Sequence, residues 1–220
     1  MKGTAVNRAD LLSEEDLDYL VEMFNIGAGN AATALNQLLN CKVDMRLPGV
    51  RVTTPSQATV AVGEPGASVT CMRMRMVGDL TGYMFFVVAE DQKTKMAELA
   101  ERSLLGPEGR NPDPERALGV LAEIGNILAG VYLTAIHDFC KLQVCHSVPV
   151  LAVDMLQALL DEAIATQTGK AQTVLLVTSE FAIDKEHFRT YLVIFPKGKS
   201  VNALVDSIKQ ARELYGFKQD

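Results

Sequence analysis

The chain has 220 residues, of which 48% are hydrophobic and 22% charged, and its formal net charge is −6. This length can bury one substantial core or two small halves fused into a single domain, and the composition is that of an ordinary soluble globular protein. The acidic balance argues against a general nucleic-acid binder, no apolar run approaches the roughly 20 residues of a membrane span, and the polar start lacks a secretory signal, so we expect a cytoplasmic protein without nucleic-acid or membrane partners.

The first elements are a long helix and a strand. Ser13 and Asp16 form a variant of the capping box, and the 3.6-residue apolar spacing after them predicts a helix that ends near Asn40. Residues 42–54 then predict a strand, in which Pro48 can be held only at a sheet edge or a bulge.

The rest of the first half is predicted to be a loop, a hairpin and a polar helix. The loop extends to Gly66. Three methionines then alternate with arginines in a half-buried strand, and core packing at period two explains that alternation better than a metal-binding surface does. The hairpin strands span 69–77 and 80–89, and the helix spans 91–105.

A segment rich in Pro and Gly, residues 106–112, predicts a linker between two halves. Beyond it Asp113 caps a helix with Pro114 at its first position, and this helix ends near Cys140. The later elements follow the order of the first half with one added helix: a strand at 142–152, the amphipathic added helix at 154–167, a hairpin at 173–183 and 187–195, and a helix at 201–215.

The order helix, strand, hairpin, helix therefore occurs twice, in halves 11–105 and 113–217. This repetition predicts an α+β fold made by internal duplication, with residues 1–220 in one pseudo-twofold domain and a central antiparallel sheet flanked by helices. Two equivalent sites, one on the long helix of each half, would follow.

The first long helix carries a polar stripe beside its buried one. Glu22 and Asn25 are three residues apart and point the same way, while Asp18 and Gly29 extend the stripe. A glycine here weakens the helix by roughly 0.5–1 kcal/mol relative to alanine, as Gly130 does in the second half. Either close approach of another surface or a packed neighbouring strand would favour bare backbone. We expect Asp18, Gly29 and Gly130 to lie where a docked substrate touches the helices.

The second long helix repeats the pair at the same spacing. Glu123 and Asn126 are three residues apart, and each asparagine is followed, after twenty-two residues, by Pro48 or Pro149. A single pair of this kind would be explained as solvated helix residues. Two pairs with the same later proline indicate a shared function.

Four cysteines occur in a chain that is long enough not to need disulfides, so reduced thiols are expected. A metal site made by His137, Cys140, Cys145 and His146 is the alternative. Cys145 and His146 are adjacent in a predicted strand and point to opposite sides, and the spacing fits no usual zinc pattern. We therefore expect no metal here.

An acid and an amide on one exposed helical face do not make a self-contained active site. The sequence shows no Ser/His/Asp set, phosphate-binding loop or dinucleotide fingerprint. A carboxamide can, however, donate and accept hydrogen bonds, so it can orient a water for in-line attack on phosphorus in a partner's site. The carboxylate can anchor on a cation beside that phosphate.

The segments EMFNIGAGNAATAL, from Glu22, and EIGNILAG, from Glu123, resemble the CheC, CheX and FliY phosphatase family of chemotaxis. The family pattern is Asp or Ser, three residues, Glu, two, Asn, twenty-two, Pro. The first half matches it completely from Asp18 to Pro48, whereas the second has Gly119 at the first position. The length and the two such helices resemble the CheC branch of the family.

This resemblance implies a phosphatase whose substrate is the phosphorylated receiver CheY, a response regulator. Glu22 and Glu123 would pair with the receiver's lysine, and Asn25 and Asn126 would position the attacking water. Mg²⁺ would sit in the receiver, so no cofactor or metal is expected on this chain. Because Gly119 cannot supply a hydroxyl or carboxylate contact, we expect both sites to work and the first to contribute more.

Two further resemblances concern partners. The run VDMLQALLDEA, from Val153, resembles the CheC helix that docks the deamidase CheD, with Asp154 at its acidic position, although a packing helix capped by Asp154 explains the same residues. The start LLSEEDLDYL, from Leu11, resembles the receiver-binding peptide of flagellar switch proteins. The alternative function is therefore a non-catalytic adaptor, like the FliM middle domain, which has this fold without the Glu and Asn pairs.

Overall fold

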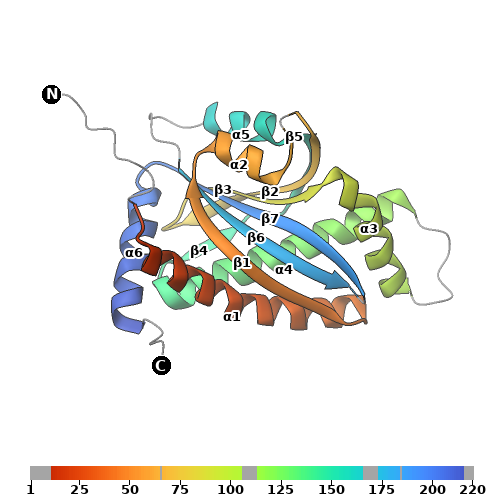
Figure 1. Ribbon diagram of the computed structural model, residues 1–220, viewed down its shortest axis with the longest axis horizontal. Coiled ribbons are helices and arrows are strands. Elements are labelled where there is room, and N and C mark those ends of the chain that lie inside the picture. The colour runs from red at the N-terminus through yellow and green to blue at the C-terminus, as the bar shows by residue number, and fades with distance from the viewer. Residues whose placement is uncertain (1–10, 65, 106–112, 166–172, 184, 216–220) are drawn as a thin grey trace.

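The computed structural model describes residues 11–64, 66–105, 113–165, 173–183 and 185–215. Helices and strands follow one another in the same order in each half (Figure 1). The first half contains α1 (Glu14–Leu39), β1 (Val43–Thr53), α2 (Pro55–Val62), β2 (Ser68–Gly78), β3 (Gly82–Ala89) and α3 (Glu90–Leu105). The second contains α4 (Pro114–Cys140), β4 (Val144–His146), β5 (Val150–Met155), α5 (Leu156–Ala165), β6 (Val174–Ile183), β7 (Glu186–Pro196) and α6 (Ser200–Tyr215).

All seven described strands form one antiparallel sheet in the order β1-β6-β7-β3-β2-β4, with β5 also paired to β2. The two hairpins meet at the centre, where β3 pairs with β7. The edge strand of each half lies beside the hairpin of the other half, because β1 pairs with β6, and β4 and β5 pair with β2. This exchange is the pseudo-twofold arrangement that the repetition predicts, and it confirms the α+β fold class.

Helices cover both faces of the sheet. In Figure 1, α1 and α4 cross one face, α2 and α5 cover the other, and α3 and α6 lie at opposite ends. The alternation in β2 separates two cores: Met72 and Met74 belong to the larger core under α1 and α4, and Cys71 belongs to the smaller core under α2 and α5. The methionine row is thus core packing, as predicted.

The loop predicted before Gly66 was wrong, because these residues contain the helix α2. Thr54 caps it, its side chain accepting from the Gln57 N–H while Gln57 reaches back to the Thr54 N–H, and Pro55 occupies the first turn. Its counterpart is α5, which packs beside it, with the Thr59 hydroxyl donating to Gln157 at 3.1 Å. The helix that the sequence suggested was extra therefore has an equivalent in the first half.

Two boundaries in the second half also differ from prediction. The strand expected at 142–152 is split into β4 and β5, with Pro149 in the gap. The helix expected from Asp154 begins at Leu156, so Asp154 lies in β5 and does not cap α5; its carboxylate accepts from the Met155 N–H at 2.7 Å. The other predicted elements are confirmed within a few residues. The predicted linker, 106–112, lies outside the described residues.

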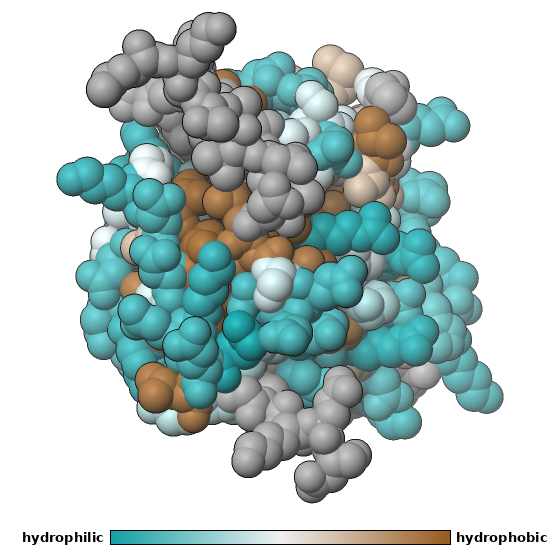
Figure 2. Space-filling view, turned by 60° about the vertical axis from the view of Figure 1, so that its left-hand side comes forward, coloured by the Kyte–Doolittle hydropathy of each residue, from teal (hydrophilic) through white to brown (hydrophobic). Residues whose placement is uncertain are grey.

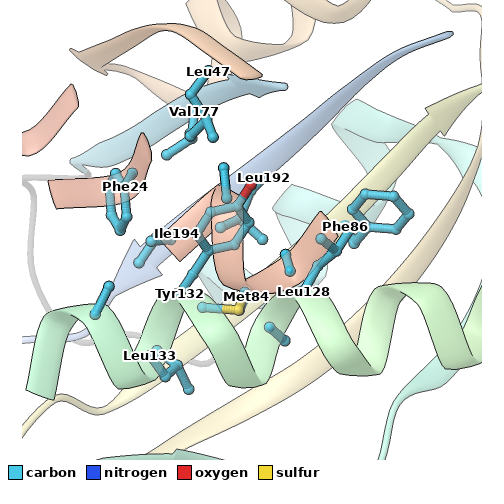
Figure 3. Close-up of a cluster of buried hydrophobic side chains, with 14 of the residues drawn as sticks. Phe24, Leu47, Met84, Phe86, Leu128, Tyr132, Leu133, Val177, Leu192 and Ile194 are labelled. Atoms are coloured by element: carbon cyan, nitrogen blue, oxygen red, sulfur yellow. The ribbon is translucent and has the colours of Figure 1, made fainter. Parts of the chain in front are cut away.

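The helices α1 and α4 pack directly against each other. Phe24 and Tyr132 meet edge to face with ring centroids 5.5 Å apart, and Gly27 of α1 lies beside Val131 of α4. These aromatic rings and the neighbouring aliphatic side chains fill the space down to the sheet (Figure 3).

By length and composition alone, α4 could span a membrane, which the expectation of no long apolar run overlooked. However, 56% of its most apolar segment is buried in the protein, as in a core helix.

The N-terminal end of α1 is tied to α6. Ser13 and Asp16 form the predicted capping box, and Arg212 donates to the buried Asp16 carboxylate at 2.7 Å. Burial would raise the pKa of Asp16, but hydrogen bonds from Ser13 and Arg212 prevail and lower it. The ionised form is therefore favoured in the folded state, and its stabilising effect is lost as acid protonates Asp16.

Figure 2 shows the side of the molecule on which α6 lies, where hydrophilic side chains surround a smaller apolar area.

Candidate functional site

The polar stripe of α1 faces outward, as the helical spacing predicts. Asp18, Glu22 and Gly29 are exposed, and Asn25 is half-buried at the border of the packed side. The buried side of the helix packs on α4 and the sheet through residues such as Phe24 and Leu35. Amphipathic packing thus fixes which way the acid and the amide point.

Asn25 is held by the backbone of Leu47. Its side-chain oxygen accepts from the Leu47 N–H at 3.0 Å, and its nitrogen donates to the Leu47 carbonyl at 3.4 Å. The β1–β6 register shifts between Arg46 and Gly49, so Leu47 and Pro48 lie in a bulge where the sheet ladder is interrupted. The asparagine amide thereby occupies backbone groups that would otherwise lack a ladder partner. One N–H and one oxygen lone pair remain for another molecule.

This contact explains the fixed separation along the sequence between Asn25 and Pro48. The residue before the proline supplies both backbone groups, and proline suits a bulge because it has no N–H to leave unpaired. The spacing from Asn25 to Pro48 is visible in the sequence, but the backbone contact that requires it is not. The Leu47 backbone is therefore a positioning element that sequence reasoning missed.

The second copy is built differently around its asparagine. Glu123 is exposed and Asn126 is half-buried, but the Asn126 side chain has no hydrogen-bond partner within the described ranges. After β4 the chain turns toward β2: the Ser147 N–H donates to the Arg75 carbonyl at 2.9 Å, and the Arg75 N–H donates to the Ser147 hydroxyl at 3.0 Å. Val148, the position equivalent to Leu47, is 82% exposed, whereas Leu47 is 3% exposed.

Asn126 lines a hollow of about 390 Å³ between α1 and α4, called here the α1–α4 hollow. Both helices and β4 contribute to it. Its polar or glycine lining residues are Gly27, Asn30, Asn126, Gly130, Thr134, Asp138 and His146, and its apolar ones are Ile26, Ile127, Val131, Ala135 and Phe139. The second pair therefore stands beside a concave surface that includes part of the first helix.

The two stripe glycines have different surroundings. A Cβ placed on Gly29 would meet nothing within 4 Å, whereas one on Gly130 would lie 3.7 Å from His146 Nε2. No neighbour in the described structure accounts for the bare backbone at Gly29. The packed neighbouring strand is thus not seen at Gly29, and a substitution there tests the other expectation, close approach of a docked protein.

We expect Gly29→Ala to raise stability and lower activity. Alanine should stabilise α1 by roughly 0.5–1 kcal/mol, while its methyl group would obstruct a surface that docks on the helix. Asn202→Ala is the control, because Asn202 is exposed on α6 rather than on either long helix, and alanine is also the better helix former there. Thermal unfolding and the receiver dephosphorylation that the family resemblance implies should be measured on both. Equal activity of the two variants would contradict a docking role for Gly29.

Asp154 lies apart from both pairs. It is exposed on β5 opposite Val69, whose side chain belongs to the core under α2 and α5. Directly opposed residues of an antiparallel pair point to the same face, so Asp154 faces away from the α1 and α4 side. Any partner that uses Asp154 would therefore occupy a different face from one that uses the Glu and Asn pairs.

The residues of the alternative metal site do not form one. Cys140 is buried, which raises its pKa to about 12, while Cys145 is exposed. The described part of the chain holds no group of three or more His, Cys, Asp or Glu side chains placed to bind a metal. His137 Nδ1 instead lies 3.1 Å from the Leu142 carbonyl. The four cysteines are free thiols.

The chain matches the model of the CheC-like family at residues 17–52 and 117–153, which contain both Glu and Asn pairs and both prolines. It is 38% identical to the CheY-P phosphatase CheC of Bacillus subtilis over 186 residues, covering 80% of this chain and 84% of the relative. It is 31% identical to the flagellar motor switch phosphatase FliY of the same organism, covering 59% of this chain and 33% of the relative.

Solved structures share the fold. The crystal structure of Thermotoga maritima FliY aligns over 91% of this chain and 98% of its own, with a TM-score of 0.68 at 19% identity. The FliM middle domain of H. pylori aligns over 89% of this chain and 99% of its own, with a TM-score of 0.59 at 14% identity. The fold thus occurs both in FliY and in the FliM middle domain.

Proposed function

This chain belongs to the CheC-like family, and we propose that it is a phosphatase that hydrolyses the aspartyl phosphate of a CheY-type response regulator in chemotaxis signalling. Its relative from B. subtilis, named as a CheY-P phosphatase, supports this activity across most of both chains. We further propose that the protein works in the cytoplasm, where such a regulator would meet it.

The observation that carries the proposal is the display of two Glu and Asn pairs on the outward faces of α1 and α4. Glu22 and Asn25 come from one helix and Glu123 and Asn126 from the other, and all four side chains are at least partly accessible. A protein docked on either helix could admit the acid and the amide together. Neither pair needs a nucleophile of its own, because water is the attacking group.

In the proposed reaction the amide of Asn25 or Asn126 orients a water in line with the phosphorus–oxygen bond of the acyl phosphate. The water oxygen attacks phosphorus, the bond to the aspartyl oxygen breaks, and aspartate and inorganic phosphate result. Glu22 or Glu123 anchors on the receiver's lysine. Charge on the phosphoryl oxygens would be neutralised by Mg²⁺ held in the receiver, and the residues of this chain would supply the positioning of the water and of the receiver's lysine.

A second candidate is a non-catalytic adaptor. The relative FliY of B. subtilis, which is named a flagellar motor switch phosphatase, supports it. Phosphorylated receiver should be mixed with the purified chain and phosphate release followed in time. Faster release supports the phosphatase; binding without faster release would replace it with the adaptor.

CheD is a further proposed partner, at a separate surface. Asp154 is exposed on β5, and α5 begins two residues later. Because this surface faces away from α1 and α4, CheD and a receiver could be bound at once. Capture of CheD by the wild-type chain but not by Asp154→Ala supports this contact, and equal capture would remove that residue from it.

A further inference from the structure

His146 presents a free ring nitrogen to the α1–α4 hollow. Its Nδ1 lies 2.9 Å from the Ser147 carbonyl oxygen. A carbonyl can only accept, so Nδ1 carries the proton in this contact, and Nε2 of the neutral ring is an acceptor. Nε2 has no partner among the described residues, and the ring lines the hollow with Asn126.

The ring stands one helical turn beyond the second pair. Nε2 is 3.7 Å from where a Cβ on Gly130 would lie, and Gly130 follows Asn126 by four residues, or roughly 6 Å of helix. A molecule that reaches the Asn126 amide along α4 would therefore also meet His146. In the first half the residue at the same distance after the asparagine is Met45, which cannot supply a comparable acceptor.

The two sites consequently differ at both ends. The first has the exposed carboxylate of Asp18 at the start of its stripe and open space over Gly29 at the end. The second has bare Gly119 at the start and His146 over Gly130 at the end. These two ends are separated by roughly 16 Å along a helix.

We propose that His146 is a positioning residue of the second site, whose Nε2 accepts a hydrogen bond from an N–H or O–H group of the docked receiver. His146 would hold the receiver at the C-terminal end of the polar stripe of α4. Gly119, at the start of that stripe, has no side chain that could do so. This inference rests on the proposed phosphatase function and concerns how the receiver is held, not the attack on phosphorus.

The test uses the full chain carrying Asn25→Ala, so that turnover comes from the second site. Adding His146→Met, which copies Met45 of the first half, should raise KM for phosphorylated receiver about 3- to 10-fold, the range for one lost hydrogen bond, with kcat within about twofold. His146→Gln, which can still accept a hydrogen bond, should recover much of that loss. A merely structural role would not favour glutamine over methionine in KM.

Three controls distinguish receiver anchoring at the second site from a general effect of losing a histidine, an effect on the first site and a folding defect. His187→Met removes an exposed histidine of β7 and should leave KM unchanged. In a chain carrying Asn126→Ala, which uses only the first site, His146→Met should have no effect. Unfolding midpoints of the variants exclude a folding defect.

An unchanged KM in His146→Met, or an equal KM for the Met and Gln variants, would overturn the inference while leaving the phosphatase intact. A fall in kcat alone would also overturn it, because anchoring acts on binding. If Asn25→Ala with Asn126→Ala kept full activity, the catalytic assignment itself would fail, and the role of His146 with it.

Discussion

Replacing Asn25 and Asn126 together by alanine is expected to lower stimulated dephosphorylation by about a hundredfold or more, the range found when a preorganised polar group is removed from a transition state. Alanine keeps the helices but cannot orient water. The rate of phosphate release at saturating phosphorylated receiver is the measurement. Asn202→Ala, which removes an exposed asparagine of α6, is the control and should be silent.

The single variants should not be equal. The Asn25 amide is fixed by the Leu47 backbone, whereas Asn126 has no partner among the described residues and must be ordered by the receiver. Ordering one side chain costs roughly 0.5–1.5 kcal/mol, which corresponds to a difference of about 2- to 10-fold. We therefore expect Asn25→Ala to lose more activity than Asn126→Ala. Equal losses would overturn this ranking.

Asn25→Ala also leaves Leu47 without its side-chain partner, so its loss must be separated from a change in folding. Asn25→Asp is informative here, because its carboxylate can still accept from the Leu47 N–H but repels the Leu47 carbonyl. Receiver binding and the unfolding midpoint of each variant should be compared with those of the parent chain. Lost turnover with both retained would place the defect in the reaction itself.

Gly82→Ala is expected to destabilise the fold by about 2–5 kcal/mol. Gly82 has φ +143°, and an added Cβ would lie 2.2 Å from the Phe195 carbonyl oxygen. Gly82 is the first residue of β3 that is paired with β7, at the centre of the sheet. Both the unfavourable backbone conformation and the clash with main chain contribute, because a strand backbone cannot move aside as a flexible side chain can.

For a domain of this size the loss corresponds to a fall in the unfolding midpoint of roughly 4–20 °C. Gly63→Ala is the matched control: its φ of 178° is extended backbone, and nothing lies within 4 Å of an added Cβ. Circular dichroism during heating compares the two. A shift of less than about 2 °C for Gly82→Ala would show that the β3–β7 pairing relaxes around the new side chain.

Local signals explain why much of the fold was predictable. Ser13 and Asp16 at the start of α1, and Asp113 with Pro114 at the start of α4, are capping residues that act within one helical turn. The period-two methionines of β2 similarly mark a strand by adjacent residues. The helix α2 had a local signal as well, the capping box of Thr54 and Gln57, and was missed because its eight residues carry only a short apolar pattern.

Most of the helices and strands, the duplication and the outward direction of Glu22 and Glu123 were predictable from the sequence, since spacing along one helix fixes which face a side chain occupies. Three features required the folded chain: β1 pairs across the halves with β6, the Leu47 backbone holds Asn25, and the chain after His146 turns to Arg75, which leaves Asn126 without a partner among the described residues. Each of those contacts has a backbone group on at least one side and joins residues far apart in the chain, and backbone groups are the same for every residue type. The repeated sequence therefore places the same Glu and Asn pair on both long helices. The different packing of the edge strands gives the two asparagines different surroundings.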